Sequence, residues 1–182
     1  MRGVNPEVAH ENMSGLSMVH AVAQAMDAEK LFHIDLNAQR IGRYDQDLRF
    51  GSEDQKGAFF LVRLLEGAGG RAGYGGPRHF DAHAYRTEDV AGVWDFAAGC
   101  MRTYKILASR AEAFDADERV REIIEENHAD PTGIAPLLAS YSAASLATLS
   151  ALDLDPDALG ARAKRYERLD QLAVEHILGA AG

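Results

Sequence analysis

The first part of the chain contains stretches whose apolar residues recur at helical spacing and, between them, a stretch in which apolar and polar residues alternate. Apolar residues recur at helical spacing between about Met13 and Ala28 and again around Lys56–Leu65, and each stretch predicts a helix. Between them, Leu31–Asn37 alternates at every second position, which is typical of a strand. One side of this strand carries Phe32, Ile34 and Leu36, and the other carries His33, Asp35 and Asn37.

Two more segments are expected to be extended. Gly3–Glu7 has the composition of the end of a strand, and Arg78–His83 that of another short strand. A long helix should follow Thr87, because the acidic pair Glu88–Asp89 suits a helix N-terminus. The apolar stripes predicted for this helix and for the last helix of the chain are Val90, Val93, Trp94, Ala97, Met101, Tyr104 and Phe114, and Leu169, Leu172, Ala173 and Ile177.

The predicted order is therefore strand, helix, strand, helix, strand, helix and a mostly helical, charge-rich tail. Such alternation is typical of parallel strands with helices outside them. Three strands alone make a poor parallel sheet, because both faces and both edges need cover. The pattern therefore predicts an α/β fold that forms a segment of a larger barrel of eight such units.

Charge and cysteine content narrow the function classes. The formal net charge of -9 disfavours a nucleic-acid or anionic-membrane surface, since both attract Lys and Arg. Cys100 is the single cysteine, so an intrachain disulfide is excluded and a reducing, cytoplasmic compartment is expected.

Met1 leads to Asn5–Pro6–Glu7 rather than to an apolar run, so no secretory signal is expected. The uncharged stretch Pro131–Leu152 contains four serines and Pro136, and we interpret it as a helix packed on one face rather than a membrane span.

A glycine-rich segment imitates a nucleotide-binding loop. Residues 67–76 contain six glycines, and Gly67–Ala72 has the spacing of a dinucleotide fingerprint. The segment follows a helix and precedes a strand, whereas phosphate cradling requires a strand, the loop and then a helix. We therefore expect a flexible connection.

A hydrolase that works through a covalent intermediate is also disfavoured, because no nucleophile-elbow pattern occurs in the sequence.

Each of the three expected strands ends in an acidic residue: Glu7, Asp35 and Asp81. The C-terminal ends of parallel strands meet at one mouth of a barrel, where three carboxylates would repel unless they were protonated or bound to cations. Oxygen-rich sites with a single imidazole suit Mg²⁺ or Mn²⁺. Each acid alone is equally consistent with a solvated turn or a helix cap. The other candidate ligands are His10, three residues after Glu7, and Asp45 and Asp47, which an extended loop would point to the same side.

Several segments, in this order, resemble the metal-site segments of the xylose isomerases, with the greatest likeness to the actinobacterial type. The likeness covers nearly the whole chain, and the order of the segments makes it specific. The segments are Asn5–Glu11, Leu31–Asn37, Tyr44–Leu48, Gly76–Asp81, Arg86–Asp89 and Glu167–Leu172.

The resemblance implies the C-terminal portion of a (β/α)₈ TIM barrel, about its last three βα units, followed by an extended helical tail. Residues 1–114 would form the partial barrel and residues 115–182 a tail for subunit association, usually in a homotetramer. The implied reaction interconverts D-xylose and D-xylulose, and D-glucose and D-fructose, by a metal-assisted hydride shift.

The resemblance also implies two divalent cations per site, with Mg²⁺ first and Mn²⁺ or Co²⁺ as alternatives. Glu7 would bridge both cations, and no catalytic residue is assigned within this chain. The further ligands would be Asp35 and Asp81 for the first cation, and His10, Asp45 and Asp47 for the second. Three neighbours are expected to support these ligands: His33, which could equally be a packed core histidine, Asn37 and His83.

Two departures from the family pattern leave a second interpretation open. Everything before the sixth strand of the family is absent from this sequence, and His83 stands where the family usually has a lysine. The expected partners are a sugar and either further copies of the chain or a separate N-terminal half. The alternative is a catalytically inactive remnant, or a metal-binding or interaction protein.

Overall fold

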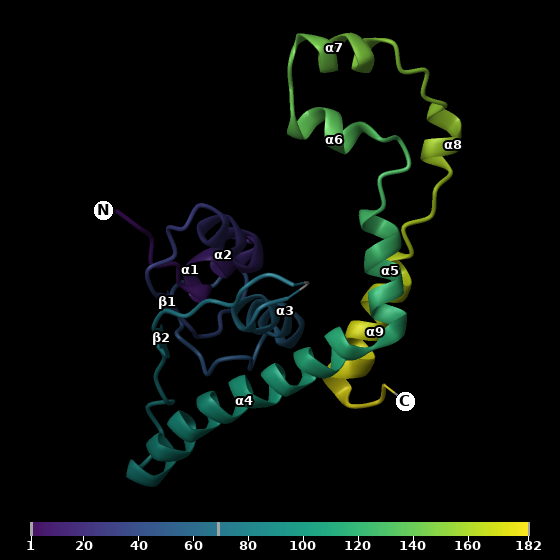
Figure 1. Ribbon diagram of the computed structural model, residues 1–182. Helices are drawn as coiled ribbons and strands as arrows, with labels where there is room; N and C mark the ends of the chain where they lie inside the picture. Colours follow the sequence, from purple (N-terminus) through teal and green to yellow (C-terminus); the bar gives the residue numbers. More distant parts are fainter. Residues whose placement is uncertain (1, 69, 182) are drawn as a thin grey trace. The chain divides into compact units, whose positions relative to one another are not determined.

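The computed structural model describes residues 2–68 and 70–181 of the chain (Figure 1). It divides into two compact units, Met1–Ala116 with Gln171–Gly182, and Asp117–Asp170. Among the described residues the two short strands are β1 (Ile34–Asp35) and β2 (Arg78–His79). The helices are α1 Val8–Met13, α2 Met18–Asp27, α3 Gln55–Glu66, α4 Val90–Ala116, α5 Glu118–His128, α6 Ile134–Ala139, α7 Ala143–Ser150, α8 Pro156–Gly160 and α9 Tyr166–Leu178.

Three extended segments lie side by side and parallel in the first unit. β1 pairs with β2, with Asp35 opposite His79. On the other side of β1, single parallel bridges join Val4 to Leu31 and Glu7 to Asp35. The predicted parallel order is confirmed, although each segment forms only one or two ladder positions. A small parallel sheet of this kind is consistent with part of a barrel, but the described residues form no closed barrel.

The helix predicted from about Met13 to Ala28 is wrong in its extent, because the chain breaks there into α1 and α2. Gly15 adopts a φ of +73°, which an L side chain rarely tolerates. Ser17 then caps α2 by accepting a hydrogen bond from the backbone N–H of His20 at 3.3 Å. Helix α1 begins at Val8, so the strand-end acid Glu7 is also the N-cap residue of a helix.

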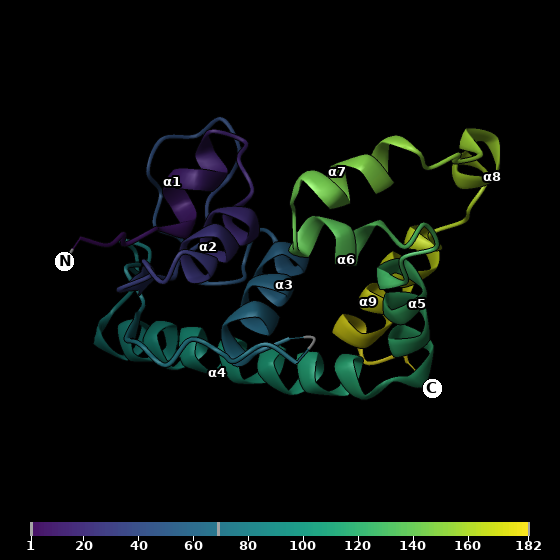
Figure 2. The same ribbon diagram turned by 45° about the horizontal axis from the view of Figure 1, so that its top comes forward.

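Helix α3 confirms the predicted apolar helix and forms the core of the first unit. It packs against α2 and along α4 (Figure 2). Phe59 and Phe60 meet Phe114 of α4 edge-on, with ring centroids 5.6 and 6.4 Å apart. Both arrangements are favourable for aromatic rings. The fully buried residues of α3 are Phe59, Leu61, Val62 and Leu65.

The stripe predicted for α4 is wrong over the first half of that helix. Val90 and Trp94 are 76% and 72% exposed, and Met101 is also exposed. The residues that α4 buries instead lie mostly in its second half, where it packs on α3: Cys100, Leu107, Ala111 and Phe114. The periodicity located a helix correctly, but the face that is buried depends on which neighbour the helix meets.

The second unit is an assembly of short helices. Val120 and Ile123 of α5 are its buried apolar residues, and Arg165 pairs with Glu126 at 2.5 Å. The single helix predicted within Pro131–Leu152 is wrong, because this stretch forms α6 and α7 with a capping box at Ser142. No helix among the described residues is both long and apolar enough to cross a membrane.

Some sequence-based expectations concern residues that the structure does not describe. Met1, from which the signal-peptide question starts, and Gly69 of the glycine-rich segment lie outside the described residues. The described part of residues 67–76 forms no helix or strand, and Gly67 ends α3 with a φ of +98°. Helix α3 precedes this segment and β2 follows it, which is the order that the sequence predicted.

Candidate metal centre

Asn37 holds the acidic cluster together at the C-terminal end of the β1 segment. Its side chain is almost fully buried, and its amide nitrogen lies 2.8 Å from Glu7 Oε1 and 3.0 Å from Asp47 Oδ1. The same nitrogen donates to the backbone carbonyl of Asp81 at 2.9 Å, and the amide oxygen accepts from the backbone N–H of Ala9 at 2.8 Å. One buried amide thus links four segments that are distant in sequence.

A first group of possible ligands consists of Glu7, His10 and Asp45. His10 lies one helical turn after Glu7 on α1, and its Nδ1 is 3.1 Å from Glu7 Oε2. Its Nε2 is 3.1 Å from Asp45 Oδ1. Glu7 is largely enclosed, whereas His10 and Asp45 are open to solvent. The group therefore has one enclosed carboxylate and an open side from which a cation could enter.

The loop that carries Asp45 and Asp47 is not extended, although the interpretation of the sequence assumed that it was. Both residues adopt positive φ angles, 42° and 45°, a region that non-glycine residues enter rarely. The buried side chain of Gln39 holds this loop, because it donates to the carbonyls of Arg40 and Arg43 and accepts from the N–H of Gln46 at 2.7 Å. The left-handed turns direct Asp45 to His10 and Asp47 to Asn37.

A second group consists of His33, Asp35 and His79. Asp35 Oδ1 is 3.0 Å from His33 Nε2 and 3.2 Å from His79 Nδ1, while Asp35 Oδ2 accepts from the amide of Asn5 at 2.8 Å. His33 therefore contacts an expected ligand, as the shared strand face predicted. His79 contacts Asp35 on the neighbouring strand, which is its register partner.

Asp81 and His83 stand closer to the edge of the cluster. The structure places the Asp81 carbonyl on Asn37, whereas its side chain is exposed and belongs to neither ligand group among the described residues. His83 turns its Nδ1 to the carbonyl of Ala84 at 3.0 Å, and its backbone N–H donates to the Asp47 carbonyl. His83 thus touches the cluster through its backbone.

Two carboxylates of the cluster have displaced pKa values. Burial raises the pKa of Glu7 above its ordinary value, the charge of Asp47 adds to this, and the Asn37 hydrogen bond and His10 oppose it. Burial would also raise the pKa of Asp35. Hydrogen bonds from Asn5, His33 and His79 outweigh burial and hold the pKa of Asp35 below its usual range. The surroundings of Asp35 thus favour its charged form, whereas burial disfavours the charged form of Glu7.

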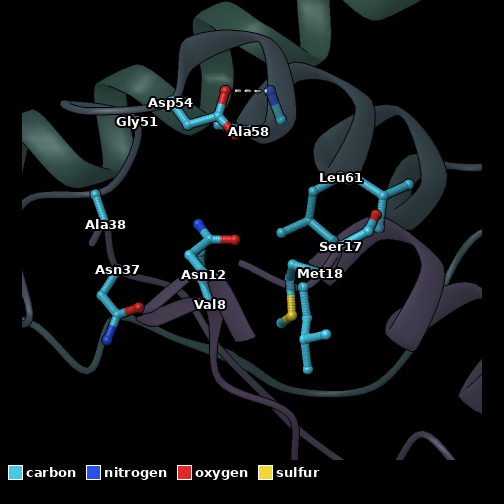
Figure 3. Close-up of a pocket in the computed structure, with 13 residues that line it drawn as sticks. Val8, Asn12, Ser17, Met18, Asn37, Ala38, Gly51, Asp54, Ala58 and Leu61 are labelled. Atoms are coloured by element: carbon cyan, nitrogen blue, oxygen red, sulfur yellow. Dashed lines mark hydrogen bonds between the residues drawn. The ribbon is translucent and has the colours of Figure 1, made fainter. Parts of the chain in front are cut away.

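A cavity of about 240 Å³ lies beside the cluster but is separate from it (Figure 3). The amide of Asn12 projects into this space, whereas the amide of Asn37 turns away from it. None of the six expected ligand residues lines the cavity. The carboxylates therefore converge on the other side of Asn37.

The comparisons with known proteins bear on this cluster. The chain is 57% and 58% identical, each over 180 residues, to the xylose isomerases of Thermus caldophilus and Thermus thermophilus. It is 54% identical over 179 residues to the xylose isomerase of Streptomyces lividans. This chain is a sequence relative of the xylose isomerases. The resemblance inferred from its motifs is confirmed.

The similarity covers almost all of this chain but less than half of each relative. The alignments cover 98–99% of this chain but only 44–46% of these xylose isomerases. No protein-family model matches the chain. The chain thus spans just under half the length of the curated relatives that it matches, and what a whole xylose isomerase does remains a proposal for it.

Sequence reasoning missed the roles of three residues: Asn5, Gln39 and His79. The sequence holds only part of the signal. Asn5 and His79 each stand two residues before a strand-end acid, so spacing alone would pair them with Glu7 and Asp81. The structure instead directs both side chains to Asp35 on the neighbouring segment, at 2.8 and 3.2 Å. Pairing between segments, which spacing along one segment does not give, decides these contacts.

Proposed function

We propose that this chain carries the two-cation site of an aldose–ketose isomerase. The reaction interconverts D-xylose with D-xylulose, and D-glucose with D-fructose, by a hydride shift between adjacent carbons of the opened sugar. The observation that carries this proposal is the carboxylate cluster around Asn37, at the ends of three parallel segments. The similarity to xylose isomerases supports the reaction class.

The donor set suits the proposed cations. It offers five carboxylates and one imidazole, which favours hard or borderline ions, with Mg²⁺ first and Mn²⁺ or Co²⁺ as alternatives. The raised pKa of Glu7 also fits, because a nearby cation would stabilise its charged form. In the proposed assignment Glu7 would serve both cations, Asp35 and Asp81 would hold the first, and His10, Asp45 and Asp47 would hold the second.

The residues of this chain would orient the ligands rather than react. When bound, the cations supply Lewis acidity and a template for the sugar oxygens. Asn37 fixes the rotamers of Glu7 and Asp47 by donating to both carboxylates. Gln39 fixes the backbone of the loop that carries Asp45. Loss of such a supporting hydrogen bond commonly lowers metal affinity by roughly 10–100-fold.

The test is calorimetric titration of the chain with Mg²⁺ and with Mn²⁺. We expect Glu7→Gln to weaken binding by at least about tenfold, because it removes a ligand charge that both cations share. Glu112→Gln, which removes an exposed charge on α4, is the matched control and should bind as the parent does. Circular dichroism confirms folding of each variant. A folded chain that binds neither ion, or binds equally with Gln at position 7, contradicts the proposal.

We also propose that the second unit contacts another subunit of a homo-oligomer, which is a tetramer in the family. Leu138, Tyr141 and Leu146 of the α6–α7 region are 58%, 64% and 48% exposed, and an interface would cover them. The single buried cysteine supports a reducing, cytoplasmic location. Light scattering after size exclusion should give a mass above 19.8 kDa that falls with Tyr141→Glu. A monomeric parent chain contradicts this proposal.

The second candidate is a metal-binding protein or inactive remnant, and it is favoured by the exposed side chain of Asp81, which belongs to neither ligand group among the described residues. One experiment distinguishes the two candidate functions. The chain is combined with a separately produced N-terminal part of the Thermus thermophilus xylose isomerase, and D-xylulose formation is measured in Mg²⁺. Turnover that Glu7→Gln abolishes supports the isomerase, whereas cation binding without turnover supports the alternative.

A further inference from the structure

The trio His33, Asp35 and His79 lies on one face of the β1–β2 pair. His33 and Asp35 are two residues apart on the same extended segment, so their side chains share a face. Asp35 and His79 are register partners on adjacent parallel strands. The convergence of these three side chains therefore follows from backbone pairing rather than from a loop, and rigid elements hold ligands more precisely than loops do.

The distances within the trio approach those around a four-coordinate ion. A tetrahedral centre with metal–ligand bonds of about 2.0–2.2 Å separates its ligand atoms by roughly 3.3–3.6 Å. Here Asp35 Oδ1 is 3.0 Å from His33 Nε2 and 3.2 Å from His79 Nδ1, and all three atoms lie within 4.8 Å of one another. Asn5 occupies the second carboxylate oxygen, which fixes the orientation of Oδ1.

The chemistry of the trio differs from that of the other ligand group. Glu7, His10 and Asp45 offer one imidazole and two carboxylates, whereas the trio offers two imidazoles and one carboxylate. Imidazole nitrogen favours Zn²⁺, Co²⁺, Ni²⁺ and Cu²⁺ over Mg²⁺. His79 is 64% exposed at its side chain, which gives an incoming ion access.

We propose that His33, Asp35 and His79 form a second site for a borderline transition-metal ion, with Zn²⁺ as the expected occupant, and that this site overlaps the proposed Mg²⁺ site at Asp35. A small rotation of the two rings would admit the ion between them and Asp35 Oδ1, and water would complete its coordination. Because Asp35 is also a proposed ligand of the first Mg²⁺, the two ions would compete for one carboxylate. The inference itself does not depend on isomerase activity.

The test uses the full chain loaded with one equivalent of Zn²⁺ in the absence of Mg²⁺. X-ray absorption at the zinc edge counts the imidazoles around the ion, and two are expected. In calorimetry, His79→Gln should weaken zinc binding by more than the roughly 10–100-fold that loss of a supporting partner costs. His20→Gln is the matched control, because it removes an exposed imidazole on α2 that belongs to neither ligand group, and it should leave this affinity unchanged. His10→Gln tests whether zinc instead occupies the other ligand group.

The outcomes separate the two proposals. One imidazole or none per zinc, or an affinity that follows His10 rather than His79, overturns the transition-metal site. Because His79 is exposed, its substitution should leave the fold intact, and His33→Gln provides a second variant with the same expected loss. A chain that binds zinc through two imidazoles but does not bind Mg²⁺ would keep this inference and contradict the proposed isomerase site.

Discussion

At the scale of single residues, Asn37 shows how a neutral side chain makes an anionic cluster tolerable. Its amide nitrogen faces two carboxylates, Glu7 and Asp47, and a backbone carbonyl, while its oxygen satisfies the N–H of Ala9. An aspartate of the same shape would add a third carboxylate to Glu7 and Asp47 and would lose the amide N–H donors. The amide is therefore the side chain that this position requires.

We expect Asn37→Ala to lower the free energy of unfolding by about 2–3 kcal/mol in the presence of a chelator, because it leaves a buried N–H without its acceptor and two carboxylates without their donor. Urea denaturation measures this change. Gln24→Ala, which truncates an exposed amide on α2, should stay within about 0.5 kcal/mol of the parent. Equal stability of the two variants would show that Asn37 does not organise the cluster.

At the scale of elements, side-chain caps mark where several helices begin. Asp54 caps α3 by accepting a hydrogen bond from the backbone N–H of Gly57 at 2.8 Å. Asp130 organises the turn before α6 in a similar way, with Thr132, Gly133 and Ala135 as donors. Local sequence is sufficient for both features, because donor and acceptor lie within five residues.

Asp54→Ala should destabilise the first unit by about 1 kcal/mol, since α3 carries much of its core and loses its cap. Asp54→Ser keeps an acceptor oxygen and should recover most of this loss. Thermal or urea unfolding of both variants gives the comparison. An alanine variant as stable as the parent would mean that water replaces the cap without cost.

Hydrogen bonds lower the pKa of Asp130 to about 2, and the Thr132 hydroxyl, 2.5 Å away, contributes most. Because the folded-state value lies below the ordinary one, the stabilisation of this turn is present above the ordinary pKa and is lost as pH falls through about 2. Thr132→Val should raise the pKa of Asp130, and Thr148→Val should not. Carboxyl NMR titration reports both, and equal midpoints in the two variants would exclude the hydroxyl as the cause.

At the scale of the whole molecule, the cluster is one part of the catalyst that we propose. The chain spans just under half the length of the relatives that it matches. Opening a sugar and holding it in one geometry requires groups besides cation ligands, and a misplacement of about 1 Å can cost about 10²-fold in rate.

We therefore expect the 182-residue chain alone to show little or no turnover of D-xylose in saturating Mg²⁺ or Mn²⁺. D-Xylulose formation is the measurement, with Glu7→Gln as the control for contaminating host enzyme. Robust turnover by the parent that disappears in this variant would show that the residues of this chain are sufficient.

The sequence by itself determined the features that depend on neighbours within a few residues. The period of two placed Glu7 and Asp35 at the ends of parallel segments and put His33 on the same face as Asp35. The period of 3.6 located α3, and the ordered motifs indicated the relatives. Local pattern is sufficient here because side-chain direction follows from backbone conformation over two to four residues.

Only the tertiary structure decided which of these residues meet. Asn37 became the centre of the cluster, and His79 faced Asp35 rather than Asp81, because these contacts span tens of residues. The buried face of α4 was likewise set by its packing against α3. The left-handed turns at Asp45 and Asp47 were set by the side chains of Gln39 and Asn37, which hold that loop. A periodic pattern encodes which side chains share a face, but the neighbour that covers the face is chosen by packing of the whole chain.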